Sequence, residues 1–202
     1  NNNIKGNYQK KEVDNDKLES SILEIKKKKI LGINVTIPFK KKVIPYLDKL
    51  SDGATKTQSV NTIYLDNNKL IGHNTDIGGF ELAIKYKKFD KSNKKIFILG
   101  AGGVAPSIIA ALYNMRAKDI TISNRTVEKA EKLKNLFKTL KVVNWGDIPD
   151  FDMVINSTSV GLNINDQINL DFSKTGKNRF YYDLIYNPKE TNFLKKAKKF
   201  EN

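Results

Sequence analysis

The segment KIFILGAGGVAPSIIAALYNM, residues 95–115, constrains the fold of this chain more than any other. A short apolar run leads directly into Gly100, Gly102 and Gly103, and an apolar stretch of helical length follows. This order predicts a buried β-strand, a tight turn and an α-helix, which together open a parallel α/β sheet.

Strands continue to alternate with helices after this segment, as expected for βαβ units. Further strands are predicted in DITISNRT (119–126), KVVNW (141–145), FDMVINSTS (151–159) and RFYYDLIY (179–186), and helices in 127–140 and 189–200. Residues 80–188 are therefore predicted to form a doubly wound, parallel-sheet domain of the Rossmann type.

Residues 1–79 are predicted to form a smaller α/β domain, on which a helix within 189–202 can pack back. Alternating or apolar patterns predict strands at 7–13 and 31–37 and a hairpin of 61–65 with 69–72, and helical spacing predicts helices at 15–30, 40–50 and 76–88. The strand at 31–37 should direct Ile33, Val35 and Ile37 to one face and Asn34 and Thr36 to the other.

The glycine turn has the spacing of a dinucleotide-binding fingerprint, with Ala105 in place of the third glycine. Gly100 permits the tight turn, Gly102 lets the backbone approach a pyrophosphate, and the N-terminus of the following helix offers N–H groups to phosphates. The alternative is a glycine-rich turn that serves packing alone. Its position between an apolar strand and a helix favours dinucleotide binding.

The end of the second strand predicts which dinucleotide binds. An NAD site expects a carboxylate there to hold the ribose 2′-hydroxyl, but this chain has Asn124, Arg125 and Thr126, with Lys129 one helical turn further on. Arg125 can contact a 2′-phosphate with two hydrogen bonds, which favours NADP. The alternative is a solvated loop arginine.

Short polar motifs recur in the first half: NVTIPFK (34–40), SVNT (59–62) and GHNTD (72–76). Their amide and hydroxyl groups suit a polyhydroxylated ligand, and Lys40 and Asp76 could form a proton-transferring pair beside it. Each motif alone is also compatible with a structural role, because Asn caps turns and Asp76 could cap the following helix. His73 is assigned no chemistry.

The charge of the chain, +14, raises the question of a nucleic-acid partner. Only three of the 36 basic residues are Arg, and the lysines are scattered through helical stretches without interleaved aromatic residues. We therefore expect no nucleic-acid partner. We also expect no membrane partner, no metal ion and a cytoplasmic location, since no apolar run reaches the roughly 18 residues that a membrane span needs. The chain has no cysteine, which excludes disulfides and thiol chemistry.

Seven motifs, in the order GINVTIPFK, SVNT, GHNTD, ILGAGGVA, SNRT, INSTSVGL and YDLIYNPKETNFLKKA, resemble those of shikimate dehydrogenases over nearly the whole chain. The resemblance implies that residues 1–79 bind substrate, that residues 80–188 bind NADP, and that the protein reversibly reduces 3-dehydroshikimate to shikimate in aromatic amino-acid biosynthesis by the chorismate pathway. It also implies roles for individual residues: Lys40 and Asp76 in catalysis; Thr36, Asn61, Asp76 and Tyr182 in substrate binding; and Gly100, Ala101, Gly102, Gly103, Val104, Asn124, Arg125, Thr126, Lys129 and Asp52 in cofactor binding.

Two features depart from the family pattern. The residues TQS before Val60 replace the usual small and apolar ones, which predicts altered local packing without affecting the role of Asn61. The family also has a Ser-x-Ser segment ahead of these residues and a Gln-bearing helix after them, so the 202 residues alone are expected to bind NADP far better than shikimate.

Three readings stay open beside this one: a quinate/shikimate dehydrogenase, an amino-shikimate dehydrogenase, and a Rossmann-type binding or regulatory protein without turnover. A monomer and a homodimer fit the sequence equally well.

Overall fold

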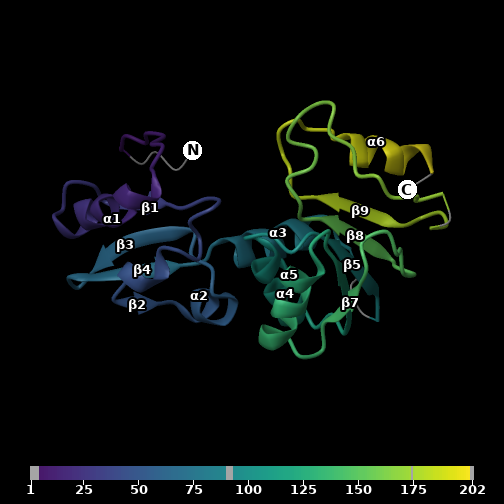
Figure 1. The fold of residues 1–202 in the computed structure, drawn as a ribbon, viewed down its shortest axis with the longest axis horizontal. Coiled ribbons are helices and arrows are strands. Elements are labelled where there is room, and N and C mark those ends of the chain that lie inside the picture. Colours follow the sequence, from purple (N-terminus) through teal and green to yellow (C-terminus); the bar gives the residue numbers. More distant parts are fainter. Residues whose placement is uncertain (1–4, 90–92, 174, 201–202) are drawn as a thin grey trace.

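A computed structural model describes residues 5–89, 93–173 and 175–200, so the predicted boundaries at residues 1 and 202 lie outside it. The chain forms two sheets that lie side by side, with α3 (Asp76–Tyr86) between them (Figure 1). The four-stranded sheet of the first half is called the first sheet here, and the five-stranded sheet of the second half is called the second sheet.

The second sheet is parallel throughout, with the order β7-β6-β5-β8-β9. Its strands are β5 (Lys95–Leu99), β6 (Asp119–Ser123), β7 (Lys141–Val143), β8 (Met153–Asn156) and β9 (Phe180–Asp183). Chain order reverses between β5 and β8, and such a switch point leaves a crevice for ligands at the carboxyl ends of the strands. The predicted α/β class with a doubly wound parallel sheet is confirmed.

Both faces of the second sheet are covered, which requires β5 to be apolar on both sides. Ile96 and Ile98 join the core under α3, α4 (Ala105–Asn114) and α5 (Val127–Leu136), whereas Phe97 and Leu99 face the opposite way. On that opposite face lie the segment around 168–172 and α6 (Asn192–Lys199) (Figure 1). The described part of α6 thus packs through Phe193 on the second sheet, and not on the first domain.

The first sheet is mixed, with the order β1-β3-β4-β2. Its strands are β1 (Gly32–Asn34), β2 (Lys49–Leu50), β3 (Thr62–Asp66) and β4 (Lys69–His73), and the helices of this half are η1 (Asn15–Lys17), α1 (Leu18–Lys26), η2 (Ile44–Tyr46) and α2 (Asp52–Thr57). The predicted hairpin is confirmed as β3–β4, and both Asn67 and Asn68 have positive φ, as a two-residue hairpin turn requires.

Two predictions near the N-terminus need correction. Residues 7–13 form no strand in the described part of the chain: they have no ladder partner there, and Tyr8 is 79% exposed. The predicted helix 15–30 becomes η1 and the shorter α1, because the chain turns at Lys28, which has positive φ. Leu18, Ile22 and Ile25, which lie at helical spacing, are buried.

The predicted strand 31–37 is limited to β1, because after Asn34 the chain turns through the segment Thr36–Phe39. Ile33 and Val35 still pack into the first core as predicted. The prediction was wrong for Ile37, which is 65% exposed.

The predicted helix 40–50 was also wrong, and η2 and β2 occupy this segment. Pro45 lacks the N–H that a longer helix would need, and β2 pairs in parallel with β4. The apolar residues of the segment nevertheless face the first core, since Val43 is buried and Ile44, Leu47 and Leu50 pack against the same cluster.

α3 confirms the helix predicted at 76–88, but only part of its apolar set faces inward. Phe80 and Ile84 are buried, whereas Leu82 and Tyr86 are 68% and 83% exposed. Because α3 begins beside the first sheet and buries Phe80 in the core of the second, the predicted domain boundary between residues 79 and 80 lies within one helix and stays a prediction. In the described parts of the chain, no helix has the length and apolar character to cross a membrane.

Candidate active site

Lys40 directly follows the turn Thr36–Phe39, which comes after β1, the edge strand of the first sheet. Backbone hydrogen bonds fix this position: the Val35 N–H donates to the Asn61 carbonyl at 2.7 Å, and the Val60 N–H donates to the Lys40 carbonyl at 2.8 Å. Since both partners belong to the SVNT motif, Lys40 and Asn61 are brought to the same end of the sheet.

The Lys40 ammonium forms an ion pair with Asp76, the first residue of α3, and the Nζ–Oδ2 distance is 2.7 Å. Their side chains are only 14% and 23% exposed. Most surface ion pairs contribute little because water screens them, but this pair is largely removed from solvent. The predicted Lys–Asp juxtaposition is therefore present in the structure.

Asn61 completes the cluster around Asp76. Its Nδ2 donates to the second carboxylate oxygen, Oδ1 of Asp76, at 2.8 Å and to Oγ1 of Thr75 at 2.8 Å. Its Oδ1 in turn accepts from the Thr75 backbone N–H at 2.9 Å. Each carboxylate oxygen of Asp76 thus has its own donor, which orients the carboxylate toward Lys40.

The glycine turn faces this cluster. Gly100 has φ +98°, and a Cβ there would lie 2.6 Å from Cγ2 of Thr158, so no other residue fits without a shift. Gly102 and Gly103 are exposed, and a Cβ on Gly103 would lie 4.0 Å from Cδ of Lys40. The open side of the turn and the Lys40 side chain therefore border the same space.

The loop after β6 is joined to the glycine turn through Asn124. Its Oδ1 accepts from the Ala101 N–H at 2.9 Å, and its Nδ2 donates to the Thr126 carbonyl at 2.7 Å. Asn124 therefore shapes the two loops, whereas Arg125, Thr126 and Lys129 are exposed beside them. No ion pair of Arg125 is found within the described residues, and the loop carries no carboxylate.

Two family descriptions match this sequence. "Shikimate dehydrogenase substrate binding domain" matches residues 1–63, and "Shikimate / quinate 5-dehydrogenase" matches residues 81–195. A protein named shikimate dehydrogenase (NADP(+)) from Pelagibacter ubique is 51% identical over 197 residues, which are 98% of this chain and 74% of that relative. This chain belongs to the shikimate dehydrogenase family. The family predicted from the sequence is confirmed.

Solved structures of the family agree with this fold. Shikimate dehydrogenase from Aquifex aeolicus is 39% identical with a TM-score of 0.85, and the match covers 94% of this chain and 70% of that one. The enzyme from Thermus thermophilus, solved in complex with NADP(H) and shikimate, is 28% identical with a TM-score of 0.82 and coverages of 93% and 70%. This chain thus spans 70–74% of the length of these three relatives.

Other predicted site residues of this shikimate dehydrogenase family member lie around the cluster with fewer contacts. Thr36 is exposed in the turn before Lys40, and Asn34 donates to Oγ1 of Thr62 at 3.3 Å. Tyr182 is half-buried, and its ring packs edge-to-face on Phe80, one helical turn after Asp76, with 5.3 Å between ring centroids. Asp52 is exposed at the start of α2, and no described hydrogen bond joins its side chain to the glycine turn.

Sequence reasoning missed three residues. Thr75 bonds to Asn61 as described above, Asn74 caps α3 through its side chain, and the Ser59 hydroxyl donates to the Gly103 carbonyl at 3.1 Å. The GHNTD motif was interpreted as a source of ligand-binding groups or of turn caps, and no role was assigned to Asn74 itself. Ser59 belongs to the unusual TQS segment, where altered packing was predicted, and it is buried and hydrogen-bonded.

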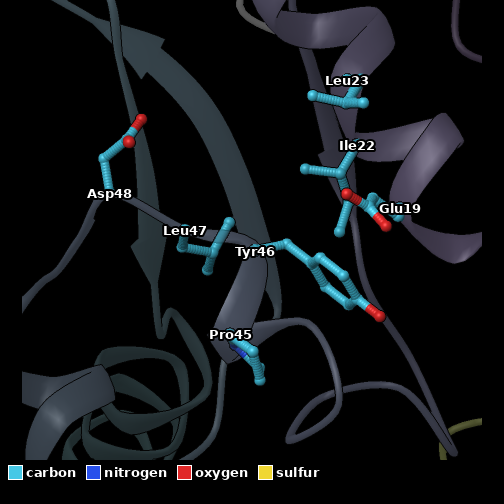
Figure 2. A pocket seen from close by; sticks show the side chains of 7 residues that line it. All are labelled: Glu19, Ile22, Leu23, Pro45, Tyr46, Leu47 and Asp48. Atoms are coloured by element: carbon cyan, nitrogen blue, oxygen red, sulfur yellow. The ribbon is translucent and has the colours of Figure 1, made fainter.

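Two surface cavities lie away from this site. One, of about 210 Å³, lies between α1 and the segment 45–48, and Figure 2 shows the Tyr46 ring pointing toward α1. The other, of about 500 Å³, is lined by residues such as Ile148 and Arg179 near the amino ends of β8 and β9. Neither cavity is lined by Lys40 or Asp76. We place the candidate active site at the Lys40–Asp76 pair and the glycine turn, because the shielded ion pair lies beside Gly103.

Proposed function

We propose that Lys40 and Asp76 are the proton-transferring pair of an NADP-dependent shikimate dehydrogenase, which reversibly reduces 3-dehydroshikimate to shikimate. The observation that carries this proposal is the 2.7 Å ion pair, largely shielded from solvent and facing the open side of the glycine turn. A non-catalytic binding protein would have no need for an ammonium held beside the cofactor turn.

The residues present fit NADP. Gly102 and Gly103 leave the turn open toward solvent, and α4 begins directly after it with its N–H groups directed at the turn. Arg125, Thr126 and Lys129 would hold the 2′-phosphate and adenine ribose. When bound, the nicotinamide supplies the hydride.

The chain's own residues supply the proton and the positioning. Reduction of a ketone places negative charge on its oxygen, and an ammonium about 3 Å away both stabilises that charge and donates its proton. Asp76 holds the Lys40 side chain in place and is itself held by Asn61. In the reverse direction the same Lys40–Asp76 pair takes up the proton that the substrate hydroxyl releases.

Thr36, Asn61, Asp76 and Tyr182 are proposed to bind the substrate hydroxyl groups. Burial raises the pKa of Tyr182, so its phenol stays protonated at neutral pH and remains a hydrogen-bond donor. The edge-to-face contact with Phe80 keeps the ring next to the helix that carries Asp76.

Replacement of Tyr182 by Phe is expected to raise the KM for shikimate about 3- to 10-fold, because one hydrogen bond of about 0.5–1.5 kcal/mol is lost. The Phe80 contact is kept, so the thermal unfolding midpoint should change little. Steady-state kinetics with shikimate varied at saturating NADP measure the effect, and Tyr181→Phe on the opposite face of β9 is the matched control. An unchanged KM would remove Tyr182 from the substrate site.

The test of the function is the appearance of reduced nicotinamide absorbance when the protein is mixed with NADP and shikimate. Quinate as the substrate and NAD as the cofactor, in all combinations, distinguish the quinate/shikimate alternative, which the second family description also names. An amino-shikimate substrate tests the amino-shikimate dehydrogenase alternative. Absence of turnover with every pair would leave a binding or regulatory protein.

We place this activity in the chorismate pathway to aromatic amino acids, because shikimate is its substrate. The cytoplasmic location, the absence of nucleic-acid and membrane partners, and the monomeric or homodimeric state stay predictions.

A further inference from the structure

A cluster of four buried polar side chains lies between the Lys40–Asp76 pair and the glycine turn. Thr57, Ser59, Asn74 and Ser107 are exposed by only 1%, 3%, 5% and 0%, and the mechanism above uses none of them. Burying polar groups is unfavourable unless they are hydrogen-bonded. In the described part of the chain no buried side-chain polar atom lacks a partner, so the cluster is fully bonded and therefore rigid.

The side-chain oxygen of Asn74 fixes the start of α3. It accepts from the backbone N–H groups of Asp76 at 3.1 Å and Ile77 at 3.3 Å. These are bonds to the second and third residues on, which is the pattern of a helix cap. Because the first of these donors is the backbone amide of Asp76 itself, Asn74 fixes the backbone position from which the Asp76 carboxylate extends.

The side-chain nitrogen of Asn74 is directed away from α3 and donates to groups that include a side chain of α4, the helix after the glycine turn. It donates to Oγ of Ser107 at 2.8 Å, to the Ser59 carbonyl at 2.8 Å and to Oγ1 of Thr57 at 3.2 Å. Ser107 lies in the first turn of α4, directly after the glycine turn. The Ser59 hydroxyl adds a second link, because it donates to the Gly103 carbonyl at 3.1 Å.

We propose that Asn74 is a positioning residue that sets the place of the Asp76 carboxylate relative to the glycine turn, with Ser59 and Ser107 as its anchors. The inference rests on the proposed function. In that reaction the proton from Lys40 and the hydride must meet at one carbonyl, yet their positions are set by different sheets. A misplacement of about 1 Å between such groups can cost about a hundredfold in rate.

Two variants cut the link while sparing the groups that touch substrate and cofactor. Asn74→Ser keeps an oxygen that favours the helix cap but is too short to reach Ser107. Ser107→Ala leaves the whole Asn74 side chain and puts a strong helix former into α4. If Asn74→Ser does not fold, Ser107→Ala still tests the proposal.

We expect kcat to fall about tenfold or more in each variant, while the KM for shikimate and the Kd for NADP change less than about threefold. Such a split follows from lost alignment in the reacting complex, whereas a damaged binding site would change the KM or Kd. Steady-state kinetics give kcat and KM, and titration of NADP alone gives the Kd.

Ser123→Ala is the matched control. Ser123 is 1% exposed, and its hydroxyl donates to the Asn144 carbonyl at 3.0 Å. Both residues belong to the second half of the chain, so this bond does not link the second sheet to the first. The kcat of this variant should stay within about twofold of the wild type, and thermal unfolding of all variants shows whether the losses of stability are comparable.

An active wild type whose Ser107→Ala variant keeps its kcat would overturn the inference alone. An equal fall of kcat in Ser123→Ala would do the same, because the effect would then follow from any lost buried hydroxyl. A wild type without turnover of shikimate would contradict the proposed function and the inference together.

Discussion

Replacing Lys40 by Met is expected to lower the turnover of shikimate by about two to four orders of magnitude, the usual loss when acid–base assistance is removed. Met keeps most of the aliphatic side chain but has no ammonium to donate to the reduced oxygen. The KM for shikimate should change much less than kcat, because Asn61 and Tyr182 are untouched. Steady-state kinetics with NADP and shikimate measure both quantities.

Lys41→Met is the matched control for this variant. Lys41 is the next residue along the chain and is exposed, so the control removes the same charge from the same segment without touching Asp76. Near-normal turnover in Lys40→Met would mean that another group transfers the proton, and Asp76→Asn would then be the decisive variant. Comparable losses in both lysine variants would point to the overall positive field instead.

The second sheet could be predicted from the sequence because every local signal agrees there. β5 is apolar on both faces, and α4 follows it with apolar residues at helical spacing. The turn between them requires a residue with positive φ and no Cβ, and Gly100 is that residue. The hairpin of the first sheet was predictable for the same reason, since Asn67 and Asn68 tolerate the positive φ of its turn.

The wrong predictions concern segments whose local pattern is compatible with more than one secondary structure, so that pairing with a distant segment determines which one forms. Residues 40–50 have apolar residues at helical spacing, but Pro45 interrupts the helix and β4 offers Leu50 a parallel ladder. Residues 7–13 were predicted as a strand, but a strand does not form without a neighbouring strand to hydrogen-bond with. Pro45 can be recognised within its own segment, but the pairing of residues 40–50 with β4 and the lack of a described ladder partner for residues 7–13 cannot.

The candidate site also has features that could be predicted from the sequence and features that depend on distant contacts. Lys40, Asn61 and Asp76 could be proposed from their chemistry and the resemblance, because each stands at the end of a predicted element. Their distances could not be predicted, since they depend on how α3 joins the two sheets. Asn74 was missed because its bond to Ser107 spans 33 residues, and no local pattern indicates such a contact.

Replacement of Arg125 by Ala is expected to weaken NADP about tenfold to a hundredfold, with little effect on NAD. A guanidinium–phosphate contact is charge-assisted and can be bidentate, and its loss costs about 1.5–3 kcal/mol. Arg125 is exposed beside Asn124, which ties this loop to the glycine turn, and no described carboxylate in the loop competes for it. The measurement is kcat/KM for both cofactors in the wild type and the variant.

Arg116→Ala is the control that removes the same charge from the same domain. Arg116 follows the C-terminal end of α4, whereas the glycine turn precedes its N-terminal end, about 15 Å away for ten helical residues. The Arg125 effect should shrink at high salt, because an exposed contact is screened. An equal loss for NADP and NAD would mean that Arg125 supports the loop without contacting the 2′-phosphate. A wild type that prefers NAD would contradict the assignment of the cofactor, since the loop would then have to hold a free 2′-hydroxyl without the carboxylate that such a site uses.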